Sequence, residues 1–255
     1  MKASSYLENR VSIITGAGRG IGKAISCRLG ELGSAVAMVD IAEELVQKAA
    51  SDLRSAGAEV SVFLADVTNE QQISDMVTAV LDAYGRIDIL VNNAGLVTNI
   101  PFSRLTLESW QRTINVNLTG SFICSRAVLP PMLEAGYGKI IFMSSGSGNT
   151  GSGGGAHYAA SKTGLLGLVR GLTREYTPKG IIVNAIAPRG IGTKEFHSSL
   201  YTSPQRLAEM QSRIPLGRIG IPEEIANLVA FLASDACNYL CGQVILVDGG
   251  RTYFT

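Results

Sequence analysis

Short apolar runs rich in β-branched residues alternate along the chain with longer stretches in which apolar residues recur at helical spacing. Strands that are apolar on both faces are typical of parallel sheets, and helical crossovers between such strands are right-handed and cover both faces of the sheet. We therefore expect an α/β fold with a doubly wound parallel sheet of about seven strands. The predicted strands are Val11–Thr15, Ala35–Val39, Val60–Leu64, Ile87–Val91, Lys139–Met143, Ile181–Ile186 and Val244–Val247.

Two irregular stretches interrupt the alternation. Residues Gly146–Gly155 are rich in glycine and serine, but they lead from a predicted strand directly into a helix. Open α/β sheets place the loops that line their ligand crevice at such positions. The second stretch, from Pro188 to about Ser212, is longer than an ordinary connection and is interpreted as a lid over the substrate.

The first strand runs into a glycine-rich turn and then a helix, which is the context of a dinucleotide-binding fingerprint. Glycines allow the backbone to approach a pyrophosphate, and the N-terminus of the helix favours its negative charge. Asp40 ends the second strand, 18 residues after Gly22, where a carboxylate would bind the ribose hydroxyls and repel a 2′-phosphate. We therefore favour NAD over NADP, although Arg19 could pair either with a 2′-phosphate or with Asp40.

Seven motifs occur in order along the chain: Thr15-Gly-x-x-x-Gly20-x-Gly22, Asp66-Val67, Asn92-Asn93-Ala94-Gly95, Asn117, Ser145, Tyr158-x-x-x-Lys162 and Asp248-Gly249-Gly250. With these motifs, the chain resembles the short-chain dehydrogenase/reductase family, a Rossmann-type family, from about Arg10 to Gly250. We therefore expect one domain over residues 1–255, with a dinucleotide-binding part at about 10–143 and a catalytic and substrate-binding part at about 144–255. The expected cofactor-binding residues are Gly16, Gly18, Arg19, Gly20, Ile21, Gly22, Asp40, Ile41, Asp66, Val67, Asn93, Ala94, Gly95, Tyr158, Lys162, Pro188, Ile191 and Thr193.

Tyr158 and Lys162 are four residues apart at the start of a predicted helix, so their side chains share one face. A nearby ammonium favours the phenolate, which allows the tyrosine to exchange a proton with the substrate. Ser145 ends the fifth predicted strand, where its hydroxyl could bind the substrate oxygen. The resemblance selects Ser145 over Ser144 and Ser147. It also implies that Asn117 holds a water that relays protons from Lys162.

One departure from the family pattern lies close to the expected site. Arg189 stands between Pro188 and Gly190, where the family has a glycine directly after the proline. The arginine could contact an anionic substrate, pair with a neighbouring carboxylate or face solvent. Lys194 and His197 are further potential cations in this segment, and Glu195 could neutralise either Arg189 or Lys194. The candidate substrate contacts are Ser147, Asn149, His157 and Arg189.

Composition and charge exclude several classes of protein. Apolar residues make up 46% of the 255 residues, enough for a large core, and the formal net charge is +1, so nothing suggests a nucleic-acid or membrane partner. The start has no signal-peptide core, and a cytoplasmic location is expected. Four scattered cysteines and two histidines do not indicate a metal site, and we expect reduced thiols. By resemblance, a homotetramer is expected.

The sequence thus predicts an NAD(H)-dependent oxidoreductase that interconverts a secondary alcohol and a ketone. The predicted substrate is small and polar, such as a polyol, a sugar or a hydroxy acid, and could be anionic. A 3-oxoacyl-thioester reductase that uses NADP(H) is the alternative within the enzymes. A non-enzymatic dinucleotide-binding protein is the alternative from another class, because a fold does not fix a function.

Overall fold

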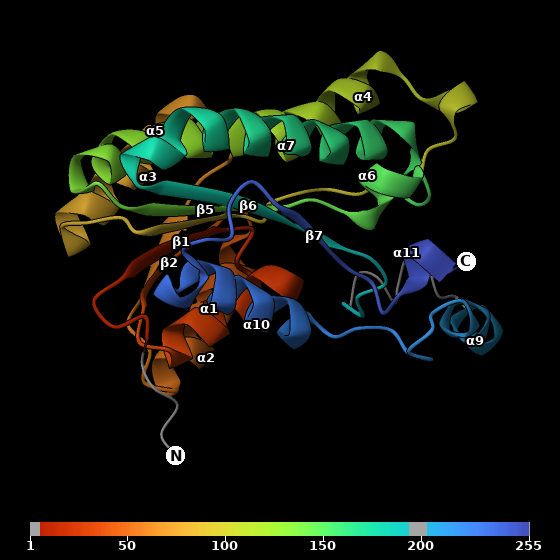
Figure 1. The fold of residues 1–255 in the computed structure, drawn as a ribbon, viewed down its shortest axis with the longest axis horizontal. Helices are drawn as coiled ribbons and strands as arrows, with labels where there is room; N and C mark the ends of the chain where they lie inside the picture. The colour runs from red at the N-terminus through yellow and green to blue at the C-terminus, as the bar shows by residue number, and fades with distance from the viewer. Residues whose placement is uncertain (1–5, 194–202, 255) are drawn as a thin grey trace.

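The computed structural model describes residues 6–193 and 203–254, and its centre is one seven-stranded parallel sheet. The strand order is β3-β2-β1-β4-β5-β6-β7 (Figure 1). All six neighbouring pairs are parallel, which confirms the predicted doubly wound sheet. The strands are β1 (Val11–Thr15), β2 (Ala35–Asp40), β3 (Val60–Leu64), β4 (Ile89–Asn92), β5 (Gly138–Met143), β6 (Ile181–Pro188) and β7 (Val244–Val247).

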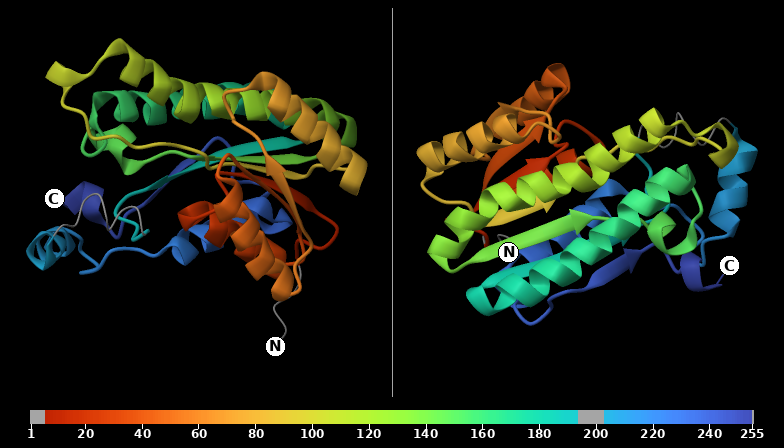
Figure 2. Two further views of the ribbon diagram at one scale, coloured as in Figure 1. Left: turned by 180° about the vertical axis from the view of Figure 1, so that it is seen from behind. Right: turned by 90° about the horizontal axis from the view of Figure 1, so that it is seen from above.

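Helices cover both faces of the sheet in two layers (Figures 1 and 2). One layer holds α1 (Gly20–Glu31), α2 (Glu43–Ser55) and α10 (Pro222–Ala233), and the other holds α3 (Glu70–Tyr84), α4 (Leu107–Ile114), α5 (Gly120–Ala135) and α7 (Gly155–Tyr176). Each layer packs its apolar side chains against one face of the strands, so the core is divided into two clusters. This division explains why the strands read as nearly continuous apolar runs.

The strand order reverses beside β1, because β1 lies between β2 on one side and β4 on the other. In open α/β sheets, ligands bind in the crevice that this reversal opens at the carboxyl ends of the strands. Short helices and loops gather at that end. They include α6 (Gly146–Thr150), α9 (Pro204–Ser212) and α11 (Arg251–Phe254).

Three segments differ from the sequence-based expectation. Residues 146–150 form one helical turn, α6, whose N-terminus is capped by the Ser145 hydroxyl. In the expected lid, residues 204–212 form the helix α9, which begins with a Ser203 cap and Pro204 in its first turn. Residues 194–202 of the lid lie outside the described part. The third segment, Asn115–Thr119, is a π-helical turn that joins α4 to α5.

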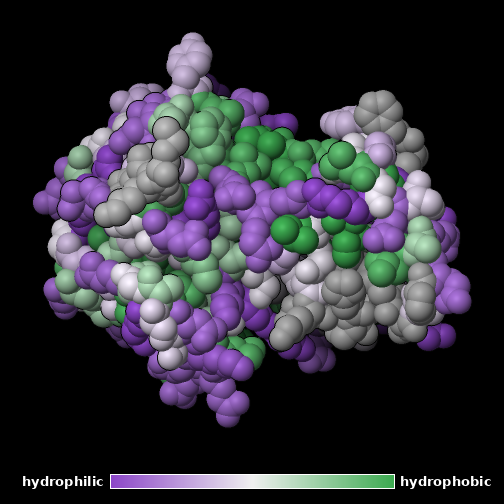
Figure 3. Space-filling model, turned by 90° about the horizontal axis from the view of Figure 1, so that it is seen from below, coloured by the Kyte–Doolittle hydropathy of each residue, from purple (hydrophilic) through white to green (hydrophobic). Residues whose placement is uncertain are grey.

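Several surface and side-chain features can be described directly from the structure. Hydrophilic and hydrophobic side chains are mixed on the face seen in Figure 3. No helix in the described ranges is long and apolar enough to span a membrane. The four cysteines form no disulfide, and residues 6–193 and 203–254 hold no group of three or more metal-ligating side chains.

Candidate active site

The glycines at the turn between β1 and α1 lie too close to neighbouring atoms to carry side chains. Gly16 has φ +64°, and a Cβ atom there would lie 2.9 Å from the Cα atom of Ala94. A Cβ atom on Gly22 would lie 2.1 Å from the carbonyl oxygen of Gly16. Helix α1 begins at Gly20 with no acidic residue in its first turn and no side-chain cap. A bare helix N-terminus behind a glycine turn fits the pyrophosphate of a dinucleotide.

The end of β4 is bonded to this turn through Thr15 and Asn93. The Thr15 hydroxyl oxygen accepts hydrogen bonds from the backbone N–H groups of Asn93 and Ala94, each at 3.0 Å. The Asn93 side-chain amide donates to the carbonyl oxygens of Thr15 and Gly16, at 2.9 and 3.0 Å. These bonds hold the two halves of the crevice together. Asn93 therefore shapes the cofactor cleft from the position that the resemblance predicts.

Two carboxylates lie where the sequence predicts the adenosine part of the cofactor to bind. Asp40 accepts hydrogen bonds from the backbone N–H of Gly18 at 2.8 Å and from that of Ala42 at 3.0 Å, one on each oxygen. Each of these oxygens keeps further accepting capacity for a ribose hydroxyl. Asp66 accepts from both the backbone N–H and the hydroxyl of Thr68, each at 2.8 Å. Its position after β3 places it beside the same crevice.

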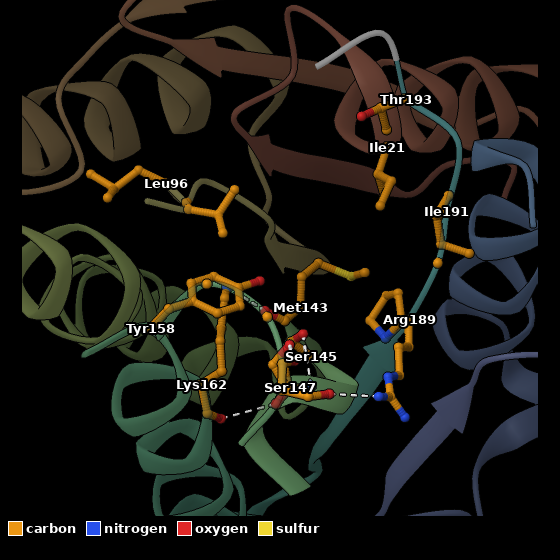
Figure 4. A pocket seen from close by; sticks show the side chains of 18 of the residues that line it. Ile21, Leu96, Met143, Ser145, Ser147, Tyr158, Lys162, Arg189, Ile191 and Thr193 are labelled. Carbon is orange, nitrogen blue, oxygen red and sulfur yellow. Dashed lines mark hydrogen bonds between the residues drawn. The ribbon is translucent and has the colours of Figure 1, made fainter. Parts of the chain in front are cut away.

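A pocket of about 470 Å³ lies at the carboxyl ends of β4, β5 and β6 (Figure 4). Tyr158, Lys162 and Ser145 all line it, so the structure brings three of the four predicted catalytic side chains together. Besides Tyr158 and Lys162, six of the residues expected to bind the cofactor line the same pocket. They are Ile21, Asn93, Gly95, Pro188, Ile191 and Thr193.

Tyr158 and Ser145 both line the pocket, and the Ser145 hydroxyl influences the pKa of the Tyr158 phenol. Ser145 leaves β5 in an extended conformation, and its hydroxyl also accepts from the backbone N–H of Ser147 at 3.1 Å. Burial raises the pKa of the Tyr158 phenol, and the Ser145 hydroxyl opposes that increase. The pair can therefore hold a proton at the phenol oxygen and present two hydroxyls to one substrate oxygen.

Lys162 lies one helical turn after Tyr158 and points into the interior. Its Nζ atom donates to the carbonyl oxygen of Met143 at 2.8 Å and lies 5.9 Å from the centre of the Tyr158 ring. Burial lowers the pKa of Lys162 to about 8, because the charged ammonium has lost its water. An ammonium at this position favours the phenolate form of Tyr158.

Asn117 is completely buried within the π-helical turn. Its side-chain oxygen accepts from the backbone N–H of Leu96 at 2.8 Å, and its amide donates to the Leu96 carbonyl and the Ser161 hydroxyl, each at 3.0 Å. A Cβ atom on Gly95 would lie 3.3 Å from both the Asn117 Oδ1 and the Lys162 Nζ atoms. Asn117 thus lies next to Lys162, and its predicted water relay stays a prediction.

The candidate substrate contacts divide into two groups. Ser147 and Arg189 line the pocket, whereas Asn149 is exposed on α6 and is not part of the pocket lining. His157 is completely buried and bonds through Nε2 to the Thr98 hydroxyl at 2.7 Å. Neither Asn149 nor His157 lines the pocket, so the structure gives no support to the expected substrate contacts of these two residues.

Several residues around the pocket were not expected from the sequence. Ser152, Met210 and Arg251 line it from three separate elements that meet only in the folded chain. Arg251 follows directly after the predicted Asp-Gly-Gly motif, which was the only signal in its neighbourhood. Lys194, Glu195 and His197 lie outside the described residues.

The buried ammonium makes the stability of the cofactor-free protein depend on pH. The pKa of Lys162 is 10.5 in its ordinary state and about 8 here, so between these values the unfolded chain binds more protons than the folded one. The free energy of unfolding therefore gains a contribution that increases with pH across this window, by about 3 kcal/mol in total. Lys162→Met lacks this titration. Denaturant unfolding of both proteins from pH 7 to 10 should show wild type gaining stability relative to the variant, and a pH-independent difference would contradict the assigned shift.

Comparison with known proteins identifies relatives over nearly the whole chain. Residues 16–252 match the family model described as enoyl-(acyl carrier protein) reductase. The chain is 40% identical to the 3-oxoacyl-[acyl-carrier-protein] reductase FabG of Thermotoga maritima, over 96% of this chain and 98% of that protein.

Solved structures give the same result. A putative gluconate dehydrogenase from Agrobacterium tumefaciens superposes with a TM-score of 0.93 at 32% identity, over 99% of this chain and 100% of that one. A putative NAD(P)-dependent gluconate 5-dehydrogenase from Beutenbergia cavernae, solved with bound NADP, has a TM-score of 0.91 at 34% identity, over 98% and 99% of the two chains. The chain therefore belongs to the short-chain dehydrogenase/reductase family, as an oxidoreductase that acts on CH–OH groups with NAD(P).

Proposed function

We propose that the protein interconverts a small polar secondary alcohol and its ketone with NAD(H). The observation that carries the proposal is the convergence of Ser145, Tyr158 and Lys162 on one pocket at the carboxyl ends of the strands. Asp40 supports NAD, because its carboxylate ends β2 beside the glycine turn, where it would repel a 2′-phosphate. The gluconate dehydrogenases among the similar structures support a small polar substrate.

The residues around the pocket divide the work of the reaction. When bound, the nicotinamide supplies the chemistry of hydride transfer. For an alcohol, the Tyr158 oxygen removes the hydroxyl proton, and for a ketone it returns that proton. The Ser145 hydroxyl donates to the substrate oxygen and fixes its position. Lys162 stabilises the deprotonated Tyr158 by its charge.

A second candidate is a 3-oxoacyl-thioester reductase that uses NADP(H). It is favoured by the 40% identity to the reductase of Thermotoga maritima. The two candidates differ in cofactor and in substrate size, so one experiment separates them.

The homotetramer, the lid over residues 188–212 and the cytoplasmic location stay predictions.

The test is a two-sided activity screen of the purified protein. One arm follows reduction of NAD+ or NADP+ with polyols, sugars, hydroxy acids and simple secondary alcohols. The other follows oxidation of NADPH or NADH with an acetoacetyl thioester. We expect the fastest turnover with NAD+ and a small polar alcohol. Turnover confined to NADPH and the thioester would establish the second candidate, and no turnover in either arm would favour a non-enzymatic dinucleotide-binding protein.

A further inference from the structure

Arg189 is built into the wall of the active-site pocket. It follows Pro188 at the end of β6, and its aliphatic stem lies against Gly146, the residue after Ser145. A Cβ atom on Gly146 would lie 2.9 Å from the Cβ atom of Arg189 and 3.0 Å from its Cδ atom. Figure 4 shows Arg189 and Tyr158 on opposite sides of Ser145. The arginine therefore lies next to the turn that carries the serine.

Among the described residues, the guanidinium of Arg189 donates hydrogen bonds to two neutral hydroxyl groups. It donates to the Thr252 hydroxyl of α11 at 3.1 Å and to the Ser152 hydroxyl before α7 at 2.5 Å. Within the described residues, it forms no ion pair with a carboxylate. A guanidinium has five N–H donors, so three remain after these two bonds. Its orientation is fixed from both sides, and it can still form the paired hydrogen bonds that a carboxylate accepts.

Positive charge dominates this wall of the pocket. Among the described lining residues, Lys162, Arg189 and Arg251 are basic, and none is acidic. Partial burial lowers the pKa of Arg189, and the neighbouring Arg251 lowers it further. The charge of Asp248 raises the pKa of Arg189. The two carboxylate oxygens of Asp248 accept hydrogen bonds from the backbone N–H groups of Gly250 and Thr252.

The charge of Arg251 lowers the pKa of Arg189, and an anion bound at Arg189 would reduce that repulsion. With a neutral ligand, the charge of Arg189 would be offset among the described residues by Asp248, without a direct ion pair. The hydroxyls of Ser152 and Thr252 satisfy only part of its donors. The site therefore has the charge and the free donors for one negatively charged group on the ligand.

We propose that Arg189 binds a carboxylate of the substrate while the reacting carbon lies at Tyr158 and Ser145, so that the enzyme acts on hydroxy acids or oxo acids. This inference rests on the proposed oxidoreductase function of the same pocket. One substrate molecule would thus carry both groups, with its carboxylate at Arg189 and its reacting alcohol at Tyr158 and Ser145. A charged contact of this kind changes affinity by roughly ten- to a hundredfold.

The test compares two substrates that differ only at one end, a sugar acid and the sugar alcohol of the same chain length. For Arg189→Met, which keeps the stem over Gly146 but removes the charge, we expect the ratio of kcat/KM for the acid to that for the alcohol to fall by roughly ten- to a hundredfold, mainly through KM. Arg189→Lys keeps the charge without the planar fork, and it should fall between the two. Arg28→Met removes an arginine of α1 that pairs with Glu31, and it should leave the ratio unchanged.

A binding measurement separates specificity from catalysis. The deoxy acid, which has the carboxylate but no reactive hydroxyl, should inhibit wild type competitively and lose roughly ten- to a hundredfold in affinity for Arg189→Met. An unchanged substrate ratio, or equal inhibition of both proteins, would overturn the role of Arg189. If wild type turns over neither the acid nor the alcohol with any nicotinamide cofactor, the proposed function fails instead.

Discussion

Replacing Tyr158 by phenylalanine should reduce kcat with the best alcohol substrate by at least ~10²–10⁴-fold, because the variant has no group to exchange the substrate proton. The ring would keep its place beside Ser145 and Lys162, and only the phenol oxygen would be lost. We therefore expect the cofactor affinity and the melting temperature to stay close to those of wild type. Steady-state kinetics, a cofactor titration and a thermal melt on the same preparation measure all three.

The matched control is Tyr84→Phe. This variant removes a tyrosine hydroxyl that is hydrogen-bonded to a serine. In the structure, the Tyr84 hydroxyl oxygen lies 2.6 Å from the Ser61 hydroxyl on β3. That pair lies on α3 and β3, away from the pocket, so the control should keep full turnover. Turnover by Tyr158→Phe within tenfold of wild type would refute the proton-transfer role. An equal loss in both variants would show that the effect is structural.

The fold was predictable because the five inner strands, β2, β1, β4, β5 and β6, are buried on both faces over nearly their whole length. Three of the seven strands have the predicted bounds, and the differences at the others have local causes. For example, β4 begins at Ile89 rather than at Ile87. The Asp88 carboxylate accepts the backbone N–H of Val11 and a hydrogen bond from Arg86 instead of extending the apolar run. Apolar periodicity identifies a strand, but polar side chains set its first residue.

The segments whose local form the sequence did not predict depend on particular side-chain contacts rather than on periodicity. Helix α6 is one turn, held by the hydroxyl of Ser145, and five residues are too few for a helical pattern to be visible. The π-helical turn around Asn117 is similar. Its extra residue is stabilised by bonds to Leu96, which is 21 positions away in the sequence. Contacts of this kind become visible only when the chain has folded.

The buried position of His157 could have been predicted from the sequence. Its neighbour Tyr158 suggested a place in the pocket, but adjacent residues on a helix point in directions about 100° apart. The buried residues of α7 include His157, Ser161, Leu165 and Val169, which recur every four positions. That spacing places the histidine on the core face of the helix. Arg251, in contrast, has no periodic signal, because α11 reaches the pocket only through long-range packing.

The cofactor preference should change when the charge of Asp40 is removed. We expect wild type to bind NAD more tightly than NADP, and Asp40→Ala to shift the ratio of the two Kd values toward NADP by roughly a hundredfold. Most of this change comes from weaker NAD binding, because charged hydrogen bonds to the ribose contribute about 1.5–3 kcal/mol. The rest comes from tighter NADP binding, because the variant no longer repels the 2′-phosphate. The backbone N–H groups of Gly18 and Ala42 would also become available to that phosphate.

Two further variants separate charge from geometry in this cofactor prediction. Asp40→Asn keeps the size and one accepting oxygen but removes the charge, so it should relieve the repulsion of NADP while keeping part of the NAD affinity. Asp75→Asn removes an exposed carboxylate of α3 and should leave both Kd values unchanged. Direct titration of the two oxidised cofactors measures the constants without any substrate. If wild type binds NADP more tightly than NAD, then Asp40 does not select the cofactor, and its bonds to Gly18 and Ala42 serve only to hold the glycine turn against β2.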